Sequence, residues 1–248
     1  MDATIFLFIF AGFLAQMVDG SIGMAYGVSS TSLLLSIGVP PAAASASVHT
    51  AEVFTTFVSG ISHWRLKNID KKLFSSLVIP GVIGGIIGAF ILSNIDTTII
   101  EPIINVYLII MGIRIIYKAF KEPAEKILAP IKTWILGIFG GFLDAIGGGG
   151  WGPVVTTTLV ANGQTPRYVI GSVNASEFFV TLAQAATFVT LLGIKEYWQI
   201  IAGLAVGGVI AAPFAAILTK KIKPKTIMLI VGITVALLNV RNIILSFL

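Results

Sequence analysis

The sequence predicts an all-α polytopic membrane protein built from two inverted repeats, each a broken, re-entrant helical hairpin followed by three transmembrane helices. Three observations lead to this fold class: an apolar composition, a duplicated pattern of acids and glycines, and an uneven distribution of basic residues. Of the 248 residues, 56% are hydrophobic and 11% are charged, whereas soluble domains carry about 25% charged residues. Apolar runs of membrane-spanning length recur along the whole chain.

The two halves of the chain match each other at an ungapped offset of 125 residues, which places Asp19 on Asp144. Apolar sequences align easily, but paired acids and paired glycines in one register indicate an internal duplication. The matched positions are Asp19 with Asp144, Gly23 with Gly148, Tyr26 with Trp151, Gly27 with Gly152, and Glu52 with Glu177.

Each repeat opens with a segment that is unsuited to a continuous helix. In the second repeat this segment is Gly140–Pro153; glycine costs roughly 1 kcal/mol in a helix interior, and proline cannot donate a backbone hydrogen bond. The first repeat has a fainter copy at Asp19–Gly27. A single helix over residues 4–37 would be about 50 Å long, well beyond a hydrocarbon core of about 30 Å. We therefore expect a hairpin that breaks at these residues and returns to the side from which it entered.

The domain boundaries follow the polar connections between apolar runs. The predicted elements are an N-terminal repeat over 1–118 (hairpin 4–37, helices 42–62, 73–92 and 99–117), a cytoplasmic linker over 119–130, and a C-terminal repeat over 131–248 (hairpin 131–161, helices 167–192, 197–218 and 226–247). A hairpin plus three spans is an odd number of crossings, so the repeats should be inverted.

The basic residues favour the hairpin arrangement. If the two segments are hairpins, thirteen basic residues lie on one side of the membrane and Lys195 alone lies on the other. If each segment were a single long crossing, the same fourteen residues would divide nine to five. Because short cytoplasmic loops are enriched in Lys and Arg, we expect the basic loops in the cytoplasm and both termini outside.

Four carboxylates are predicted at membrane depth, where an ionised acid costs several kcal/mol unless it is paired or hydrated. Glu52 and Glu177 lie near the middle of their helices and are candidates for proton coupling or gating; alternatively, they are neutral acids that join helices by hydrogen bonds. Asp19 and Asp144 carry the same candidate role, with helix capping as an equal alternative.

The breaks and the polar faces of helices 42–62 and 167–192 are the candidate substrate site. Helix N-termini near mid-membrane present free N–H groups that attract anions, and glycine allows close approach of a ligand. Small residues also serve tight helix crossings, which is the alternative for the glycines. The candidate substrate-binding residues are Gly23, Tyr26, Gly27, Ser47, His49, Gly148, Gly149, Gly150, Trp151, Gly152, Ser172 and Asn174.

The composition argues against several other classes of protein. There is no cysteine and there are only two histidines, so we expect no bound metal, no cofactor and no catalytic residues. No lysine follows Gly147–Gly150 as it would in a nucleotide loop, and no Gly-x-Ser-x-Gly elbow is present. The net charge of +5 is explained by the basic loops rather than by nucleic acid. The expected partners are a small anion and the lipid bilayer, and homo-oligomer formation is left open.

The two motifs Val18-Asp-Gly-Ser-Ile-Gly23 and Gly140-Gly-Phe-Leu-Asp-Ala-Ile-Gly-Gly-Gly-Gly-Trp-Gly-Pro153, with spans on either side, resemble the TauE/SafE family of sulfite and organosulfonate exporters. The resemblance covers essentially the whole chain. It implies a secondary transporter that exports sulfite, thiosulfate or organosulfonates across a prokaryotic inner membrane. We expect alternating access, with proton coupling through the buried acids. The alternative from the residues is a transporter or channel for Na⁺ or a metal ion that uses the same carboxylates.

Overall fold

The computed structural model describes residues 3–22, 24–120, 130–193, 195–218 and 224–246, and within these ranges the regular structure is entirely helical. This confirms the predicted all-α class. The elements are α1 (Ala3–Ile22), α2 (Tyr26–Ser36), α3 (Pro41–Arg65), α4 (Lys71–Asn94), α5 (Thr97–Lys118), α6 (Pro130–Gly147), the π-helical segment η1 (Trp151–Thr156), α7 (Thr157–Ala161), α8 (Pro166–Leu192), α9 (Trp198–Leu218) and α10 (Pro224–Ser246).

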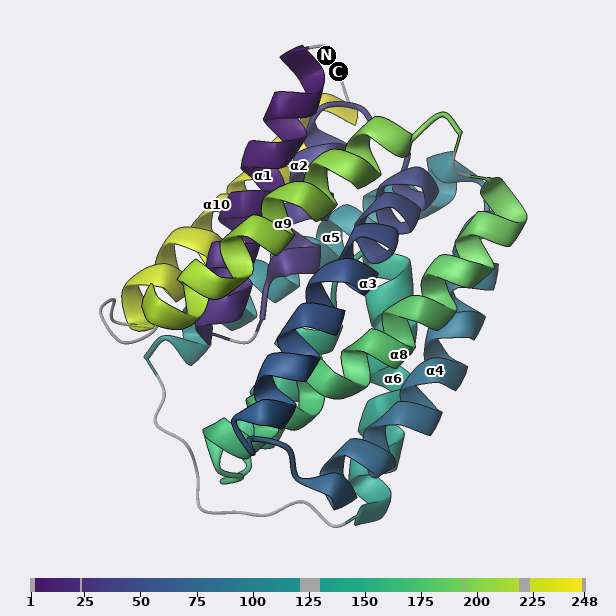
Figure 1. Cartoon of the computed structure of the whole chain (residues 1–248). Coiled ribbons are helices and arrows are strands. Elements are labelled where there is room, and N and C mark those ends of the chain that lie inside the picture. The colour runs from purple at the N-terminus through teal and green to yellow at the C-terminus, as the bar shows by residue number, and fades with distance from the viewer. Residues whose placement is uncertain (1–2, 23, 121–129, 194, 219–223, 247–248) are drawn as a thin grey trace.

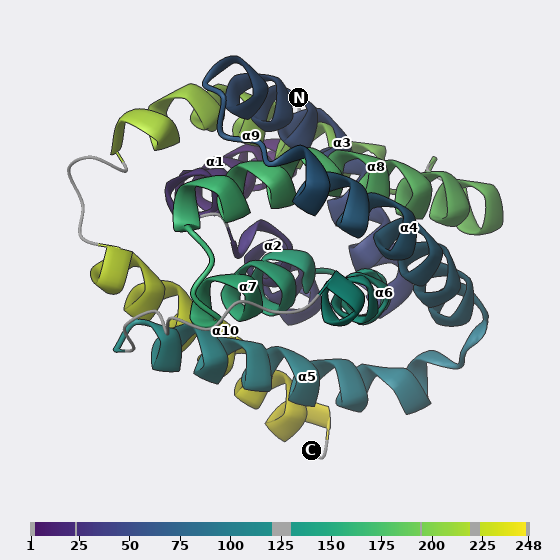
Figure 2. The same ribbon diagram turned by 90° about the horizontal axis from the view of Figure 1, so that it is seen from below.

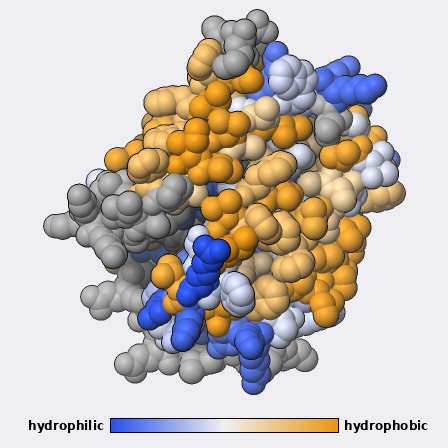
Figure 3. Space-filling model, in the orientation of Figure 1, coloured by the Kyte–Doolittle hydropathy of each residue, from blue (hydrophilic) through white to orange (hydrophobic). Residues whose placement is uncertain are grey.

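The outer surface of the bundle fits a hydrocarbon environment. Among the described residues, α4, α5, α8 and the segment Met228–Ser246 of α10 are long and apolar enough to cross a membrane. Figure 3 shows a face that is mainly hydrophobic across its middle, with hydrophilic residues toward the bottom and the upper right. Large apolar side chains point outward along most helices, for example Phe90 at 56% and Ile230 at 62% exposure. The protein is therefore a helical membrane protein.

Local sequence explains where the central helices begin. Pro41 and Pro166 occupy the first helical positions of α3 and α8, where the missing N–H has no helical partner in any case. Asp70 caps α4 by accepting hydrogen bonds from the backbone of Lys72 and Leu73. The two prolines thus mark the starts of α3 and α8, the helix pair on which the candidate site is built, and the Asp70 cap marks the start of α4.

The helices of the two halves pair with each other. The main pairs are α1 with α9, α4 with α6, α3 with α8, α5 with α10 and α4 with α8, and α3 also packs against α9. This set is unchanged when α1, α3, α4 and α5 are exchanged for their counterparts α6, α8, α9 and α10. Figure 2 shows α2, α6 and α7 lying between the α5–α10 pair and the α3–α8 pair. In Figure 1, α1 begins and α10 ends at the same end of the bundle. The inverted orientation of the two halves across the membrane stays a prediction.

Both predicted breaks are present but are shorter than expected. α1 continues through Asp19 to Ile22, and α6 continues through Gly140 and Gly141 to Gly147. The second break is confined to residues 148–150, where Gly148 has φ +63°. In the first break Ala25 has φ 95°, a left-handed backbone conformation that is unfavourable for most residues other than glycine. The hairpin arms are therefore unequal, with 20 and 11 residues in the first repeat.

Tight helix crossing explains why α6 tolerates its early glycines. A β-carbon on Gly141 would overlap the carbonyl of Gly81, and one on Gly84 would overlap the carbonyl of Ile138. Small residues let the α4 and α6 backbones approach this closely. The predicted site residue Gly23 and most of the predicted linker 119–130 lie outside the described residues, so the division into two repeats at that linker also stays a prediction.

Candidate functional site

The carboxylate of Asp144 lies against the break between α6 and η1. Its Oδ1 accepts hydrogen bonds from the backbone N–H of Gly150 at 2.6 Å and of Trp151 at 2.8 Å, and its Oδ2 accepts one from Nε2 of Gln184 at 3.0 Å. The positive φ of Gly148 reverses the chain, so that the N–H groups of the returning arm face back toward α6. The capping alternative therefore holds for Asp144. The N–H donors expected at this break are held by an oxyanion that the protein supplies itself.

The first repeat has the corresponding contact. The carboxylate of Asp19 lies close enough to the backbone N–H of Tyr26 to interact with it, and these positions match Asp144 and Trp151 at the offset of 125. An aspartate thus lies beside the first residue of the returning arm in each half, which supports the duplication inferred from sequence.

His49 connects the polar face of α3 to the end of α6. Its Nδ1 lies 2.8 Å from Oε2 of Glu52 and 3.9 Å from Oδ2 of Asp144, and its Nε2 lies 3.1 Å from the backbone carbonyl of Asp144. The ring stacks on Phe188, with centroids 6.2 Å apart. A carbonyl only accepts, so Nε2 carries a hydrogen. The contact between Nδ1 and Glu52 then contains one proton, on the nitrogen or on the oxygen.

The two hairpin tips touch each other next to Glu52. Oγ1 of Thr31 donates to the carbonyl of Gly148 at 2.6 Å. A β-carbon on Gly27 would lie 2.5 Å from Cα of Gly149 and 3.3 Å from Oε1 of Glu52. Glycine at positions 27 and 149 is thus required for the direct contact between the tips.

The four predicted carboxylates form one buried cluster. Asp19, Glu52, Asp144 and Glu177 are all 9% exposed or less, and Glu177 lies near enough to the other three to interact with them electrostatically. Within the described parts of the chain, His49 is the side chain that pairs with these acids, to Glu52 and to Asp144. In the same parts, no group of three or more His, Asp or Glu is arranged to hold a metal ion.

Two of the predicted binding side chains are engaged elsewhere along the α3–α8 pair. The hydroxyl of Ser172 accepts a hydrogen bond from the backbone N–H of Asp70 at 2.8 Å and also lies 3.3 Å from its carbonyl. Asn174 accepts one from Ser59 at 2.9 Å. The structure therefore places Ser172 and Asn174 at the connection into α4 and at the α3–α8 contact, and it does not bring them to Asp144.

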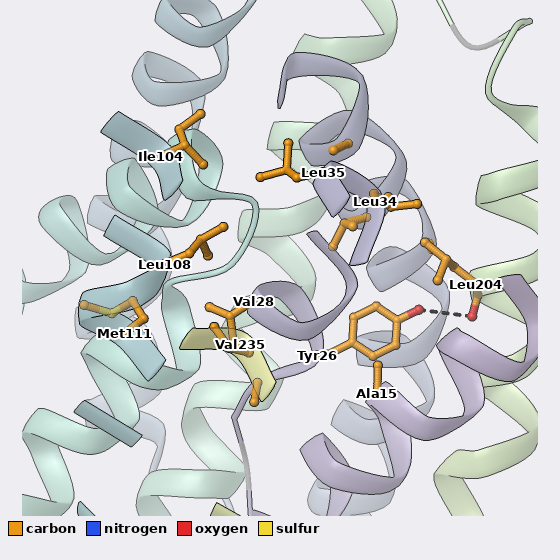
Figure 4. Packing of buried hydrophobic residues seen from close by; sticks show 14 of the residues in the cluster. Ala15, Tyr26, Val28, Leu34, Leu35, Ile104, Leu108, Met111, Leu204 and Val235 are labelled. Carbon is orange, nitrogen blue, oxygen red and sulfur yellow. Dashed lines mark hydrogen bonds between the residues drawn. The ribbon is translucent and has the colours of Figure 1, made fainter. Parts of the chain in front are cut away.

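The remaining candidates are buried near the breaks. The hydroxyl of Tyr26 donates to the carbonyl of Leu204 at 3.0 Å, as Figure 4 shows, and Nε1 of Trp151 donates to the carbonyl of Val173 at 3.2 Å. These two rings anchor the returning arms to α9 and α8. Gly152 is buried within η1. The Ser47 hydroxyl is buried and has no hydrogen-bond partner in the described residues.

Two residues of the cluster were not predicted from the sequence. Gln184 lies seven residues after Glu177, which places both on one face of α8. This spacing could have identified Gln184 as a site residue from the sequence. Tyr107 comes from α5, and its hydroxyl donates to the carbonyl of Gly149 at 3.3 Å. Its ring also fills the space that side chains at Gly147 and Gly150 would need. Only the tertiary arrangement brings Tyr107 to the break.

Comparison with known proteins identifies close similarity over nearly the full length. The family model described as Sulfite exporter TauE/SafE matches residues 8–242. The chain is also 44% identical over 247 residues to the Bacillus subtilis (strain 168) protein named "Probable membrane transporter protein YtnM", covering 96% of this chain and 82% of that protein. No solved structure matches.

Proposed function

Because the chain belongs to the Sulfite exporter TauE/SafE family of membrane transporters, we propose that it is a secondary transporter that exports small sulfur-containing anions from a prokaryotic cell. Sulfite, thiosulfate and organosulfonates are the substrate class. The family description and the membrane-transporter name of the Bacillus relative support this class.

The observation that carries the proposal is the hydrogen bonding of the Asp144 carboxylate. Two backbone N–H groups and the Gln184 amide donate to it. An oxygen of sulfite or of a sulfonate needs the same kind of donors, because N–H groups at the start of a helix stabilise negative charge. We propose that the substrate oxyanion takes these donors when the Asp144 side chain moves away.

Alternating access is the proposed mode of transport. The two hairpin tips meet at Gly27 and Gly149, and the surrounding acids are buried. This arrangement supports an occluded conformation in which neither side reaches the donors. Movement of one half against the other would separate the tips and open one side at a time.

Proton coupling is proposed to use the pair His49 and Glu52. One proton lies in their 2.8 Å contact, and His49 also touches the carbonyl of Asp144. Four neighbouring acids, with one imidazole beside Glu52 and Asp144, cannot all be ionised without strong repulsion in a medium of low dielectric constant. The cluster is therefore suited to take up and release protons as the anion binds and leaves.

Flux into proteoliposomes tests this function. Purified protein should give sulfite or sulfonate uptake that depends on the pH gradient, and Glu52→Gln should abolish that dependence. Glu101→Gln is the matched control, since Glu101 lies on α5 and takes part in none of the His49 or Asp144 contacts. Absence of anion flux from the wild-type protein, with Na⁺ flux in its place, would overturn the proposal.

Cation transport is the second candidate, and the four clustered carboxylates favour it. The absence of a metal-holding group among the described residues speaks against a divalent ion. Isothermal calorimetry with sodium sulfite, potassium sulfite and sodium chloride separates the two functions, because heat that follows Na⁺ supports the cation and heat that follows sulfite supports the anion.

A further inference from the structure

Two cations lie on one face of α5 without a carboxylate partner among the described residues. Arg114 and Lys118 are one helical turn apart, and both are half-buried. Nη2 of Arg114 donates to Oγ1 of Thr158 at 2.6 Å, and Nζ of Lys118 lies 4.0 Å from the sulfur of Met24, its hydrogen-bond contact among the described residues. In the part of the chain that the structure describes, the ion pairs are those of His49 with Glu52 and with Asp144, and no described carboxylate pairs with Arg114 or Lys118. Like charges at this spacing repel each other, and an anion between them would remove that cost.

Comparison of the two repeats separates the roles of the two cations. Arg241 on α10 corresponds to Arg114 at an offset of 127, and its Nη1 donates to the carbonyl of Ser36 at 3.1 Å. Each arginine thus reaches the end of the other half's returning arm, where a cation is favoured by the helix dipole. This explains both arginines. The same role does not extend to Lys118. At the offset of 127, the residue of the second half that corresponds to Lys118 is the exposed Leu245.

Lys118 begins a row of side chains that leads to the break. Tyr107, Arg114 and Lys118 are spaced by seven and four residues, which places them on one face of the helix. The row is about 16 Å long at 1.5 Å per residue. At its far end the Tyr107 hydroxyl contacts the carbonyl of Gly149. Lys118 therefore lies on the same face of α5 as Tyr107, which touches the proposed anion site.

We propose that Arg114 and Lys118 form an anion-recruiting site that concentrates the oxyanion substrate at the end of α5 before it reaches the break. This inference rests on the proposed transport function. The ligand chemistry is an oxyanion with at least one unit of negative charge, held by one guanidinium and one ammonium group with the Thr158 hydroxyl beside them. The phosphate of an anionic lipid has the same chemistry, and the experiment distinguishes the two sources.

The test compares Lys118→Gln with Lys118→Arg and with Arg241→Gln. Arg114 is left in place because its bond to Thr158 also supports α7. Arg241→Gln is the control for the loss of one positive charge, since Arg241 is the counterpart of Arg114 in the other repeat and lies away from Lys118. Initial rates of sulfite uptake into proteoliposomes are measured over a concentration series at low and high ionic strength, and thermal stabilisation of the purified protein by sodium sulfite gives a binding readout that does not depend on transport.

Lys118→Gln should raise the KM for sulfite roughly three- to tenfold at low salt without changing kcat. The difference should shrink at high salt, where screening weakens the attraction. Lys118→Arg should restore the wild-type KM, and Arg241→Gln should leave it unchanged. Stabilisation by sulfite should weaken in Lys118→Gln alone.

A wild-type KM for Lys118→Gln at low salt, or an equal change in Arg241→Gln, would overturn the recruiting site. If phosphatidylglycerol vesicles stabilise the wild type but not Lys118→Gln while the KM is unchanged, the pair holds a lipid phosphate and the proposal is wrong. If the wild type transports no sulfite, the proposed function fails. The sulfite stabilisation of the Lys118 variants then decides separately whether the pair binds an oxyanion.

Discussion

The Asp144 carboxylate accepts a hydrogen bond from the backbone N–H of Trp151 at 2.8 Å, across the break between α6 and the returning arm of the second hairpin. The Gly150 N–H donates to the same oxygen. The protein thus holds an oxyanion of its own at the place where the sequence predicts a substrate oxyanion.

Replacing Asp144 with alanine should destabilise the protein. Without the carboxylate, two buried N–H groups and the Gln184 amide lose an acceptor, and a buried unsatisfied donor costs about 1–3 kcal/mol. We expect a lower Tm for Asp144→Ala in detergent, in buffer that contains no oxyanion. Asp144→Asn keeps an acceptor oxygen and should lose less. Equal Tm values for wild type and Asp144→Ala would show that these bonds contribute nothing to stability.

Replacing Gly27 with alanine should separate the hairpin tips. The added β-carbon would lie 2.5 Å from Cα of Gly149, a backbone atom that cannot move without shifting the break. Overpacking of this kind costs typically 1–3 kcal/mol, and we expect anion flux to fall at least about tenfold because the tip contact is lost. Gly60→Ala is the control, because its β-carbon would lie at an ordinary 3.5 Å from Ala175. A Gly27→Ala protein with wild-type flux would contradict the role of the tip contact.

Replacing His49 with glutamine should alter the pH dependence of transport. The amide can still hydrogen-bond Glu52 and the Asp144 carbonyl, but it cannot exchange the proton that lies in the 2.8 Å contact. We expect anion exchange at equal pH to continue, while uptake driven by a pH gradient falls by about tenfold or more. The measurement is sulfite flux with and without the gradient. A gradient-driven flux that equals the wild-type value would place the coupling proton elsewhere.

The orientation in the membrane can be read with single cysteines, since the natural chain has none. Lys71 and Lys195 are both exposed, at the start of α4 and in the connection before α9. The inverted-repeat model predicts that Lys71→Cys reacts with a membrane-impermeant maleimide only from the cytoplasmic side and Lys195→Cys only from outside. Labelling of both from the same side would contradict it.

The sequence was sufficient to predict the features that depend on local chemistry and on repetition. The all-helical class, the existence of both breaks and the capping alternative at Asp144 follow from apolar runs, glycine and proline, and short-range hydrogen bonding. The pairing of acids in one register also identified Asp19 and Asp144, which lie beside the starts of the two returning arms in the structure.

The features that depend on packing between distant segments could not be predicted. Gly140 and Gly141 looked unsuited to a helix, but their lack of side chains lets α6 pack closely against its neighbours, and α6 continues through them. The contact of His49 with Asp144 joins residues 95 positions apart. Tyr107 has no counterpart pattern in the second repeat, so nothing in the sequence relates it to Gly149.

Calorimetric binding of sulfite to the wild type and to Asp144→Ala tests the central claim most directly. If Asp144 holds the donors that the substrate uses, its removal should free them, and Asp144→Ala should bind sulfite about tenfold more tightly than the wild type, corresponding to about 1.4 kcal/mol. The same comparison with Asp19→Ala reports on the first repeat. Sulfite binding to Asp144→Ala that is equal to or weaker than wild-type binding would contradict the claim that the Gly150 and Trp151 N–H groups form the anion site.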